Sequence, residues 1–504
     1  MEDGKSTMLG GALLLTAGSL GLRVMQLVFQ IYISGILGAP GLGRMQLVMT
    51  VGSFALVLGS GGVRVAAAYL TAGEAGLGNH RAVASAMVCC EIYGGFLSIL
   101  AAAGLWIFAE PLAGHMLGDA GGSLSLRLYA LFLPVTVMGA VLGGWYTAAG
   151  RIRALVGSEL VERAASMILV AALLRLGIPG NDPCAGVILG TGLASLGCCL
   201  CLLRGYLQWA RNYPPESVKS MMGRLMKLAV PLGLGDLLRN GLGAMENLLI
   251  PRGLRRGGRD EETALGAYGT VCGMVFPVIT FPSMILYALG DLLVPEMARC
   301  QAKGRWDRVR FLTDKCLRLT VILGAAWAGI CLGLGQELGM LLFGSQLAGE
   351  YICCFALLIL MLYPDAITDG VLKGLGQQVY SVRYNTLTSV IDLGLLAVLL
   401  PRYGMGGFLA AFTVSHGVNF FLSFRRLMVV SGYRPELGQL WRVGAAMISG
   451  LTALHFMTGN GTIGGVLLGT GVFLGVFSVM TMLLKAMKPE DAAWIREMWR
   501  RMRQ

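Results

Sequence analysis

Long apolar runs dominate this sequence, and they set the solvent in which the chain can fold. A helix needs about 20 predominantly apolar residues to cross a bilayer. About fourteen segments meet that length, over residues 8–36, 46–71, 83–109, 125–149, 154–177, 184–208, 225–250, 266–295, 312–334, 350–372, 380–400, 405–430, 440–458 and 462–486. The segments lack the alternation of barrel strands, so we expect an all-α polytopic membrane protein with about 14 transmembrane helices.

The composition also indicates that most of the chain folds in lipid. Only 13% of the residues are charged, against about 25% in a typical soluble domain. The first apolar run exceeds the core of a signal peptide and no cleavage pattern follows it, so we expect a retained first span. The 12 cysteines lie mostly inside spans and, with the histidines, lack the spacing of a zinc site. The sequence therefore predicts no metal and no cofactor.

The net charge of +12 raises the question of nucleic acid, but its placement favours a membrane. Lys and Arg concentrate in the even-numbered connections and at the C-terminus, which the positive-inside rule assigns to the cytoplasm. We therefore expect a multi-pass protein of the cell membrane with both termini cytoplasmic and no nucleic-acid partner. One outer loop, residues 252–259, is an exception with four arginines. Residues 487–504 read as a basic amphipathic tail on the anionic inner leaflet.

The sequence also repeats itself at a constant spacing of 226 residues. GNHRAV at 78–83 matches GRWDRV at 304–309, and residues 144–174 match residues 370–400. In the second match Gly144 falls on Gly370. One register kept over so much of the chain predicts two parallel copies of a six-helix bundle.

Parallel repeats related by an axis along the membrane normal are a transporter architecture. The expected organisation is an N-lobe over 1–208, a cytoplasmic linker over 209–224 and a C-lobe over 225–430. Two further spans occupy 431–486, followed by the tail. The substrate site is expected between the lobes, opening alternately to each side of the membrane.

Arginines inside the apolar runs are the first candidates for that site. Arg23 stands in the first run, Arg239 at a comparable depth in the seventh, and Arg64 in the second. Because ionisable groups in a membrane usually face a cavity or a partner, we expect them to form a cationic cavity. A guanidinium grips phosphate oxygens bidentately, so the predicted ligand is an anionic phosphate or diphosphate headgroup. Arg252, in the outer loop, and Arg127 are further candidates.

Two alternatives for these charges stay open. Each arginine can instead pair with a carboxylate of its own lobe, for example Arg23 with Glu91. Three carboxylates are candidates for binding a coupling proton or sodium ion: Glu246 in the seventh run, and Asp365 with Asp369 on one face of the tenth. The two aspartates can equally cap a helix bent at Pro364.

Three stretches carry a resemblance to a known family: 11–48, 230–254 and DGVLKGLGQQ at 369–378. They resemble stage V sporulation protein B, in the polysaccharide-flippase branch of the MATE-like (MOP) exporter superfamily related to the lipid II flippase. The resemblance implies two six-helix lobes in a V shape, alternating access, a lipid-linked oligosaccharide substrate and a connection with spore cortex peptidoglycan. It also places Arg23 where the lipid II flippase has its first cavity arginine. Relatives often carry a second basic residue where this chain has Phe29 and Gln30.

The expected function is therefore a flippase, not an enzyme. It would move an undecaprenyl-diphosphate-linked oligosaccharide or peptidoglycan precursor outward, with membrane lipids as its other partners and the monomer as the working form. No phosphate loop, metal cluster or nucleophile motif indicates catalysis. The alternative is a cation-coupled multidrug exporter of the same superfamily, whose organic cations the buried arginines would repel.

Overall fold

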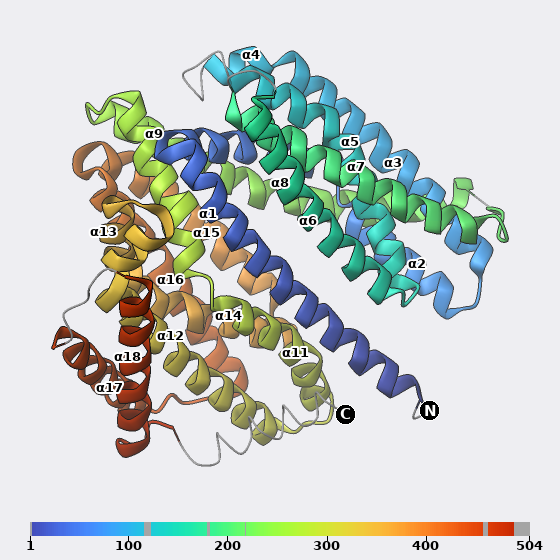
Figure 1. The fold of residues 1–504 in the computed structure, drawn as a ribbon. Coiled ribbons are helices and arrows are strands. Elements are labelled where there is room, and N and C mark those ends of the chain that lie inside the picture. The colour runs from blue at the N-terminus through green and yellow to red at the C-terminus, as the bar shows by residue number, and fades with distance from the viewer. Residues whose placement is uncertain (1–2, 115–121, 179–181, 217, 457–461, 488–504) are drawn as a thin grey trace. The chain divides into compact units, whose positions relative to one another are not determined.

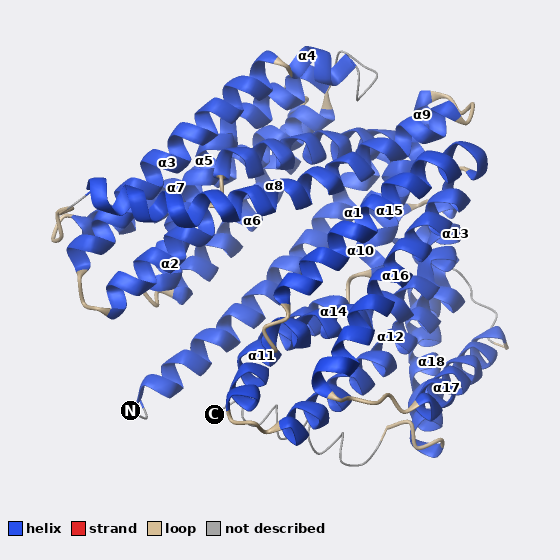
Figure 2. Cartoon of the chain, turned by 180° about the vertical axis from the view of Figure 1, so that it is seen from behind, coloured by secondary structure: helices blue, strands red, loops and turns tan. Residues whose placement is uncertain are grey.

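The computed structural model describes residues 3–114, 122–178, 182–216, 218–456 and 462–487, and in these ranges every regular element is helical (Figures 1 and 2). The predicted all-α class is confirmed. Within the same ranges, ten helices or runs of helices are long and apolar enough to cross a membrane. The count of fourteen spans stays a prediction, and all but the first residue of the predicted tail at 487–504 lies outside the described residues.

The helices follow the predicted spans closely over most of the chain. In the first half they are α1 (Asp3–Ser60), α2 (Val63–Gly76), α3 (His80–Ile107), α4 (Ala109–Leu112), α5 (Gly122–Ala148), α6 (Ile152–Leu176), α7 (Pro183–Ala210) and α8 (Val218–Arg256). In the second half they are α9 (Glu261–Gly269), a π-helix (Thr270–Val275), α10 (Phe276–Ile279), α11 (Ser283–Ala302), α12 (Trp306–Phe343), α13 (Gln346–Phe355), a 3₁₀ turn (Ala356–Leu358), α14 (Ile359–Gly374), α15 (Gln378–Tyr403), α16 (Met405–Ser431), α17 (Leu437–His455) and α18 (Ile463–Leu483).

The break expected between the first two runs lies at Gly38, where two helices within α1 meet at a non-helical residue with φ 65 and ψ 178. A second break comes at Gly61 and Gly62, whose φ values are 47 and 74. The sequence did not predict this second break, which lies inside the run expected at 46–71. Glycine adopts positive φ at no steric cost, so both breaks fall where glycine fits best.

The chain divides into two compact units. Unit 1 comprises Met1–Phe29, Ile36–Pro251 and Glu261–Gly266, and unit 2 comprises Gln30–Gly35, Arg252–Asp260 and Ala267–Gln504. Most of α8, the first helix of the predicted second repeat, therefore packs within unit 1. The two units are defined by contacts, whereas the lobes expected at 1–208 and 225–430 are defined by the sequence repeat. Those lobe boundaries stay a prediction.

Several contacts hold the start of α8 in unit 1. A Cβ on Gly233 would lie 2.6 Å from the carbonyl carbon of Gly61, so the two backbones touch directly. Arg224 pairs with the buried Glu74 at the end of α2, with Nη1 2.5 Å from Oε1. The backbone N–H of Glu216 donates to Ser85 Oγ of α3 at 2.8 Å. The first turns of α8 are thus fixed to α2 and α3.

The internal repeat reappears in the hydrogen bonds of two turns. Before α3, the backbone N–H groups of Gly78, Asn79 and His80 donate to Ala75, Glu74 and Gly78. Before α12, those of Gly304, Arg305 and Trp306 donate to Gln301, Cys300 and Gly304, each 226 residues later. The bonds around Gly150 and Gly376 match at the same spacing.

Helix packing follows the same register. A Cβ on Gly144 would lie 3.3 Å from the backbone oxygen of Arg64, where α5 meets α2. A Cβ on Gly370 would lie 3.1 Å from the Cα of Gly290, where α14 meets α11. Arg64 and Gly290 are themselves 226 residues apart, so one repeat position carries an arginine in unit 1 and a glycine in unit 2.

Candidate functional site

Arg23, Arg64 and Arg239 all belong to unit 1, on α1, α2 and α8, and each is exposed. The backbone of α1 lies against α6 at Gly21, where a Cβ would be 3.6 Å from Leu160. Arg64 is close enough to Glu159, the preceding residue of α6, to interact with it electrostatically. The packing thus brings the stretches that carry Arg23 and Arg64 to the same acidic part of α6.

Arg239 has a local partner. Its Nη2 lies 3.0 Å from Asp236 Oδ1, one helical turn away, and 76% of its side chain is exposed. Ion pairs this exposed contribute about 0–1 kcal/mol to stability, so Arg239 can exchange Asp236 for another anion at little cost.

The remaining basic candidates have different surroundings. Arg127 forms an ion pair with Glu110 of α4 at 2.8 Å and lies over the ring of Trp106. Its guanidinium is therefore engaged at the junction of α4 and α5. Arg252 is half-buried near the end of α8 and belongs to unit 2. Glu246, a candidate for the coupling ion, is half-buried on α8 within unit 1.

Glu91 does not serve as a partner for Arg23. Both of its carboxylate oxygens are buried, and neither has a hydrogen-bond partner among the described residues. The alternative pairing of these two residues therefore does not form in this structure.

The two aspartates of α14 differ in how their charge is met. Asp369 Oδ2 lies 2.6 Å from Lys373 Nζ, and its other oxygen accepts a hydrogen bond from Ser381. Asp365 Oδ2 accepts from Asn419 Nδ2 of α16 at 3.1 Å. The second Asp365 oxygen and the Asn419 side-chain oxygen are buried without a partner among the described residues. Asp365 and Asn419 thus offer two oxygens without donors, whereas both oxygens of Asp369 have partners. A bound proton or a hard cation therefore suits Asp365 better than Asp369.

Gln30, where the related family often has a basic residue, has a structural contact in unit 2. Its side chain is 6% exposed, and Nε2 donates to the backbone oxygen of Gly273 in the π-helix at 2.9 Å. A π-helix leaves some backbone carbonyls without well-formed hydrogen bonds, and the Gln30 amide donates to one of them.

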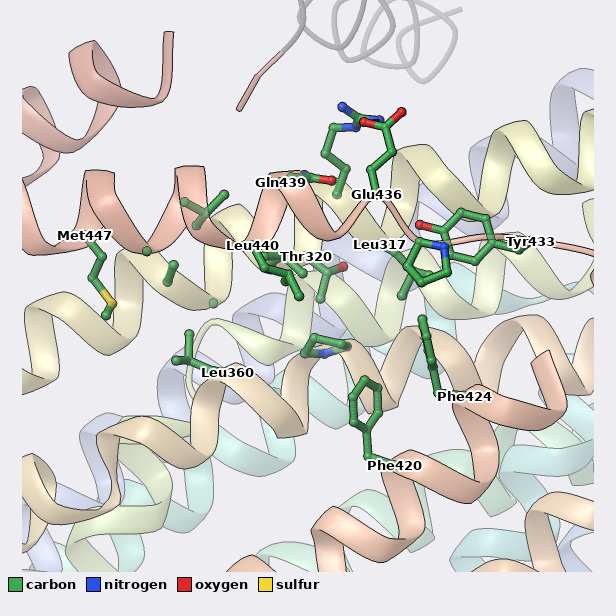
Figure 3. A pocket seen from close by; sticks show the side chains of 18 residues that line it. Leu317, Thr320, Leu360, Phe420, Phe424, Tyr433, Glu436, Gln439, Leu440 and Met447 are labelled. Atoms are coloured by element: carbon green, nitrogen blue, oxygen red, sulfur yellow. Dashed lines mark ion pairs between the residues drawn. The ribbon is translucent and has the colours of Figure 1, made fainter. Parts of the chain in front are cut away.

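Unit 2 contains a mostly apolar pocket of about 410 Å³ between α12, α14, α16 and α17 (Figure 3). Its apolar walls include Leu360, Phe420, Phe424 and Met447. One end is polar, with Gln439, whose Nε2 is buried without a partner among the described residues. A site of this size and character suits an extended hydrocarbon chain with one polar contact.

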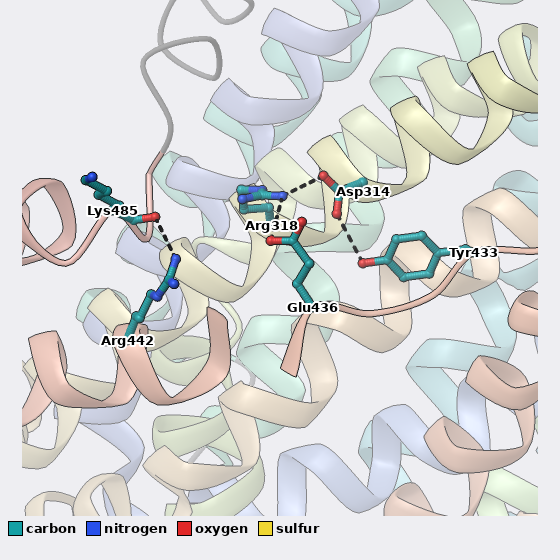
Figure 4. Close-up of polar contacts among 6 residues, drawn as sticks. All are labelled: Asp314, Arg318, Tyr433, Glu436, Arg442 and Lys485. Atoms are coloured by element: carbon teal, nitrogen blue, oxygen red, sulfur yellow. Dashed lines mark hydrogen bonds and ion pairs between the residues drawn. The ribbon is translucent and has the colours of Figure 1, made fainter. Parts of the chain in front are cut away.

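A polar network at the same end was not anticipated from the sequence (Figure 4). Arg318 is 3% exposed, and its Nη2 lies 2.7 Å from Asp314 Oδ2 and 3.7 Å from Glu436 Oε2. The Tyr433 hydroxyl donates to Asp314 Oδ1 at 3.4 Å. Burial and the carboxylate of Asp314 raise the pKa of Tyr433, so this donor keeps its proton. The signal in the sequence was the spacing of Asp314 and Arg318, one turn apart on a helix.

This network and the apolar contacts attach α17 and α18 to α12. Phe473 of α18 is fully buried, and a Cβ on Gly329 of α12 would lie 2.2 Å from its ring. Gly450 of α17 meets the same ring. Two glycines thus let one aromatic side chain join three helices.

Comparison with known proteins gives one sequence relative and several folds. No known family profile matches the chain. It is 23% identical over 428 residues to Stage V sporulation protein B of Bacillus subtilis (strain 168), covering 82% of each chain. The structure of the lipid II flippase MurJ in its inward closed conformation matches with TM-score 0.70 and 11% identity, over 93% of this chain and 98% of that one.

A second solved structure matches nearly as well. An inward-facing multidrug resistance MATE family transporter of the MOP superfamily aligns with TM-score 0.63 and 13% identity, over 82% of this chain and 96% of that one. At such identities the solved structures establish the fold alone. This chain is a multi-pass membrane protein that is similar in sequence to Stage V sporulation protein B and has the fold of the MOP-superfamily transporters.

Proposed function

We propose that this protein is a flippase that moves an undecaprenyl-diphosphate-linked oligosaccharide or peptidoglycan precursor outward by alternating access. The observation that carries the proposal is the set of exposed arginines on three helices of unit 1: Arg23, Arg64 and Arg239. They hold the diphosphate during passage. The protein works as a monomer in the cell membrane with both termini cytoplasmic, in synthesis of the envelope or the spore cortex, and it breaks no covalent bond.

The pocket of unit 2 supports a lipid carrier. It is bounded by α17, which lies beyond the twelve helices of the predicted repeats, and its walls are mostly apolar. In our proposal the hydrocarbon tail of the carrier occupies this pocket while the headgroup crosses. The arginine of the outer loop, Arg252, meets the headgroup at the outer face.

Coupling is proposed at Asp365, where a buried carboxylate oxygen and the Asn419 side-chain oxygen have no donor among the described residues. Asp369 and Glu246 are secondary candidates. An inside-negative potential also favours outward movement of an anion, by about 2.3 kcal/mol per charge per 100 mV. The two drivers are separated by collapsing the potential and the ion gradients one at a time.

The test is translocation of a fluorescent undecaprenyl-diphosphate sugar in liposomes that contain the purified full chain. A hydrogen bond to a charged group contributes about 1.5–3 kcal/mol, so Arg23→Ala and Arg64→Ala should each slow translocation about 10- to 100-fold. Arg299→Ala is the matched control, because that side chain is 74% exposed beside Glu296. No translocation of any lipid-linked precursor by the unchanged protein would overturn the proposal.

A second candidate, a cation-coupled multidrug exporter, is favoured by the similarity to the MATE transporter fold. The exposed arginines oppose it, since they repel organic cations. We expect no efflux of cationic dyes from cells that express the protein, with or without sodium and proton gradients. Gradient-driven efflux that disappears in an Asp365→Asn variant would favour this second function instead.

A further inference from the structure

Glu91 lies near the middle of α3, within one of the apolar runs, and the proposed transport step does not use it. Both carboxylate oxygens are buried without a hydrogen-bond partner among the described residues. An ionised carboxylate in such surroundings loses its hydration and gains nothing in return. The carboxyl group therefore carries a proton in this conformation.

Packing does not require a carboxyl group at this position. The repeat register places Glu91 opposite Leu317 of α12, which is 5% exposed in unit 2. The turns before α3 and α12 share their hydrogen bonds at that register, so the two positions are structurally equivalent. One repeat has a leucine at this position, and the other has a glutamic acid whose buried oxygens make no hydrogen bond among the described residues.

The neighbours of Glu91 are weakly polar. Cys90 of the same helix, and Cys199 and Tyr206 of α7, are near enough to interact with it electrostatically. From α2, α4 and α5, the helices packed against α3, no ionisable side chain of the described residues acts on it.

These surroundings exclude a metal ion as the occupant. A hard cation needs six or more oxygen ligands, and the described residues contain no group of acidic, histidine or cysteine side chains that could hold a metal. A proton needs one oxygen, which the carboxyl provides.

We propose that Glu91 is a proton-binding site of unit 1. It holds its proton while α3 and α7 both pack against α5 as in this structure, and it releases the proton to water, leaving a carboxylate, when that packing opens. The proton step rests on the proposed alternating access and adds to it a second titrating group, separate from Asp365. Because the proposed alternating access opens unit 1 to each side in turn, each cycle releases one proton to the water on one side of the membrane and captures one from the other side.

The first test needs no transport substrate. Infrared spectra of the full chain in lipid nanodiscs, recorded across neutral pH, report the carbonyl stretch of protonated carboxyl groups. We expect Glu91→Gln to remove one such band that the unchanged protein shows at neutral pH. The matched control is Glu110→Gln, because Glu110 is 71% exposed and paired with Arg127, so that change should remove none. If Glu91→Gln leaves the carboxyl region unchanged, the proposal is wrong.

The second test separates this proposal from the flippase itself. Glu91→Leu installs the side chain of the other repeat, and its melting temperature should equal or exceed that of the unchanged protein, since an unpartnered polar group is removed. In liposomes, translocation by the unchanged protein should respond by up to about tenfold per pH unit imposed across the membrane. Glu91→Leu and Glu91→Gln should translocate with a weaker response, and Asp365→Asn added to either variant should remove what remains. Failure to translocate any precursor would overturn the flippase and leave the infrared result standing, whereas an unaltered pH response in both variants would overturn the proton site.

Discussion

Gly233→Leu is expected to separate α8 from α2 and to prevent unit 1 from packing. A Cβ there would lie 2.6 Å from the carbonyl carbon, 2.8 Å from the oxygen and 3.0 Å from the Cα of Gly61. All three are backbone atoms, so no rotamer change of a neighbour relieves the clash. Overpacking typically costs about 1–3 kcal/mol, and we expect the upper end or beyond, seen as aggregation on size exclusion or a large fall in melting temperature.

The control lies two residues away on the same helix. Nothing lies within 4 Å of a Cβ on Gly235, so Gly235→Leu should change the free energy of unfolding by less than about 0.5 kcal/mol. If the two variants melt at the same temperature, the close approach of α8 to Gly61 is not what holds this helix in place.

Arg318→Met is expected to destabilise unit 2 by about 3–5 kcal/mol, the usual cost of removing one partner from a buried ion pair. The side chain is 3% exposed and its partner Asp314 is 25% exposed, so the remaining carboxylate cannot recover full hydration. The readout is the melting temperature in detergent. Asp314→Asn, added to Arg318→Met, should restore part of the loss by removing the stranded charge.

Arg310 provides the comparison on the same helix. It pairs with Asp307 at 2.5 Å, yet the two side chains are 45% and 99% exposed. Exposed pairs contribute about 0–1 kcal/mol, so Arg310→Met should leave the melting temperature nearly unchanged. Equal losses in Arg310→Met and Arg318→Met would show that burial does not govern the strength of these pairs.

Apolar length predicted most of this fold because it is a property of each segment alone. The run predicted at 405–430 corresponds to α16 at Met405–Ser431, and the run at 125–149 to α5 at Gly122–Ala148. Hydropathy is insensitive to backbone dihedrals, so the break at Gly61 and Gly62 and the π-helix at Thr270–Val275 were not predicted. Both depend on local conformations that a count of apolar residues does not register.

Candidate site residues were found where charge in an apolar run was the signal, as with Arg23 and Asp365. Their partners depend on contacts between distant segments, which spacing along the chain does not report. Arg127 meets Glu110 from a different helix, and Asp365 meets Asn419, 54 residues away. For the same reason the sequence offers Glu91 as a partner for Arg23, although packing isolates it.

The attachment of α8 to α2 and α3 changes the role of the connection that starts at Arg211. Contacts from Val218, Arg224 and Gly233, all on α8, hold the start of the second half against the first without help from that connection. We therefore expect covalent continuity there to be redundant for assembly. A gene divided at this point, encoding two polypeptides in one membrane, would be expected to yield the same protein as a two-chain complex.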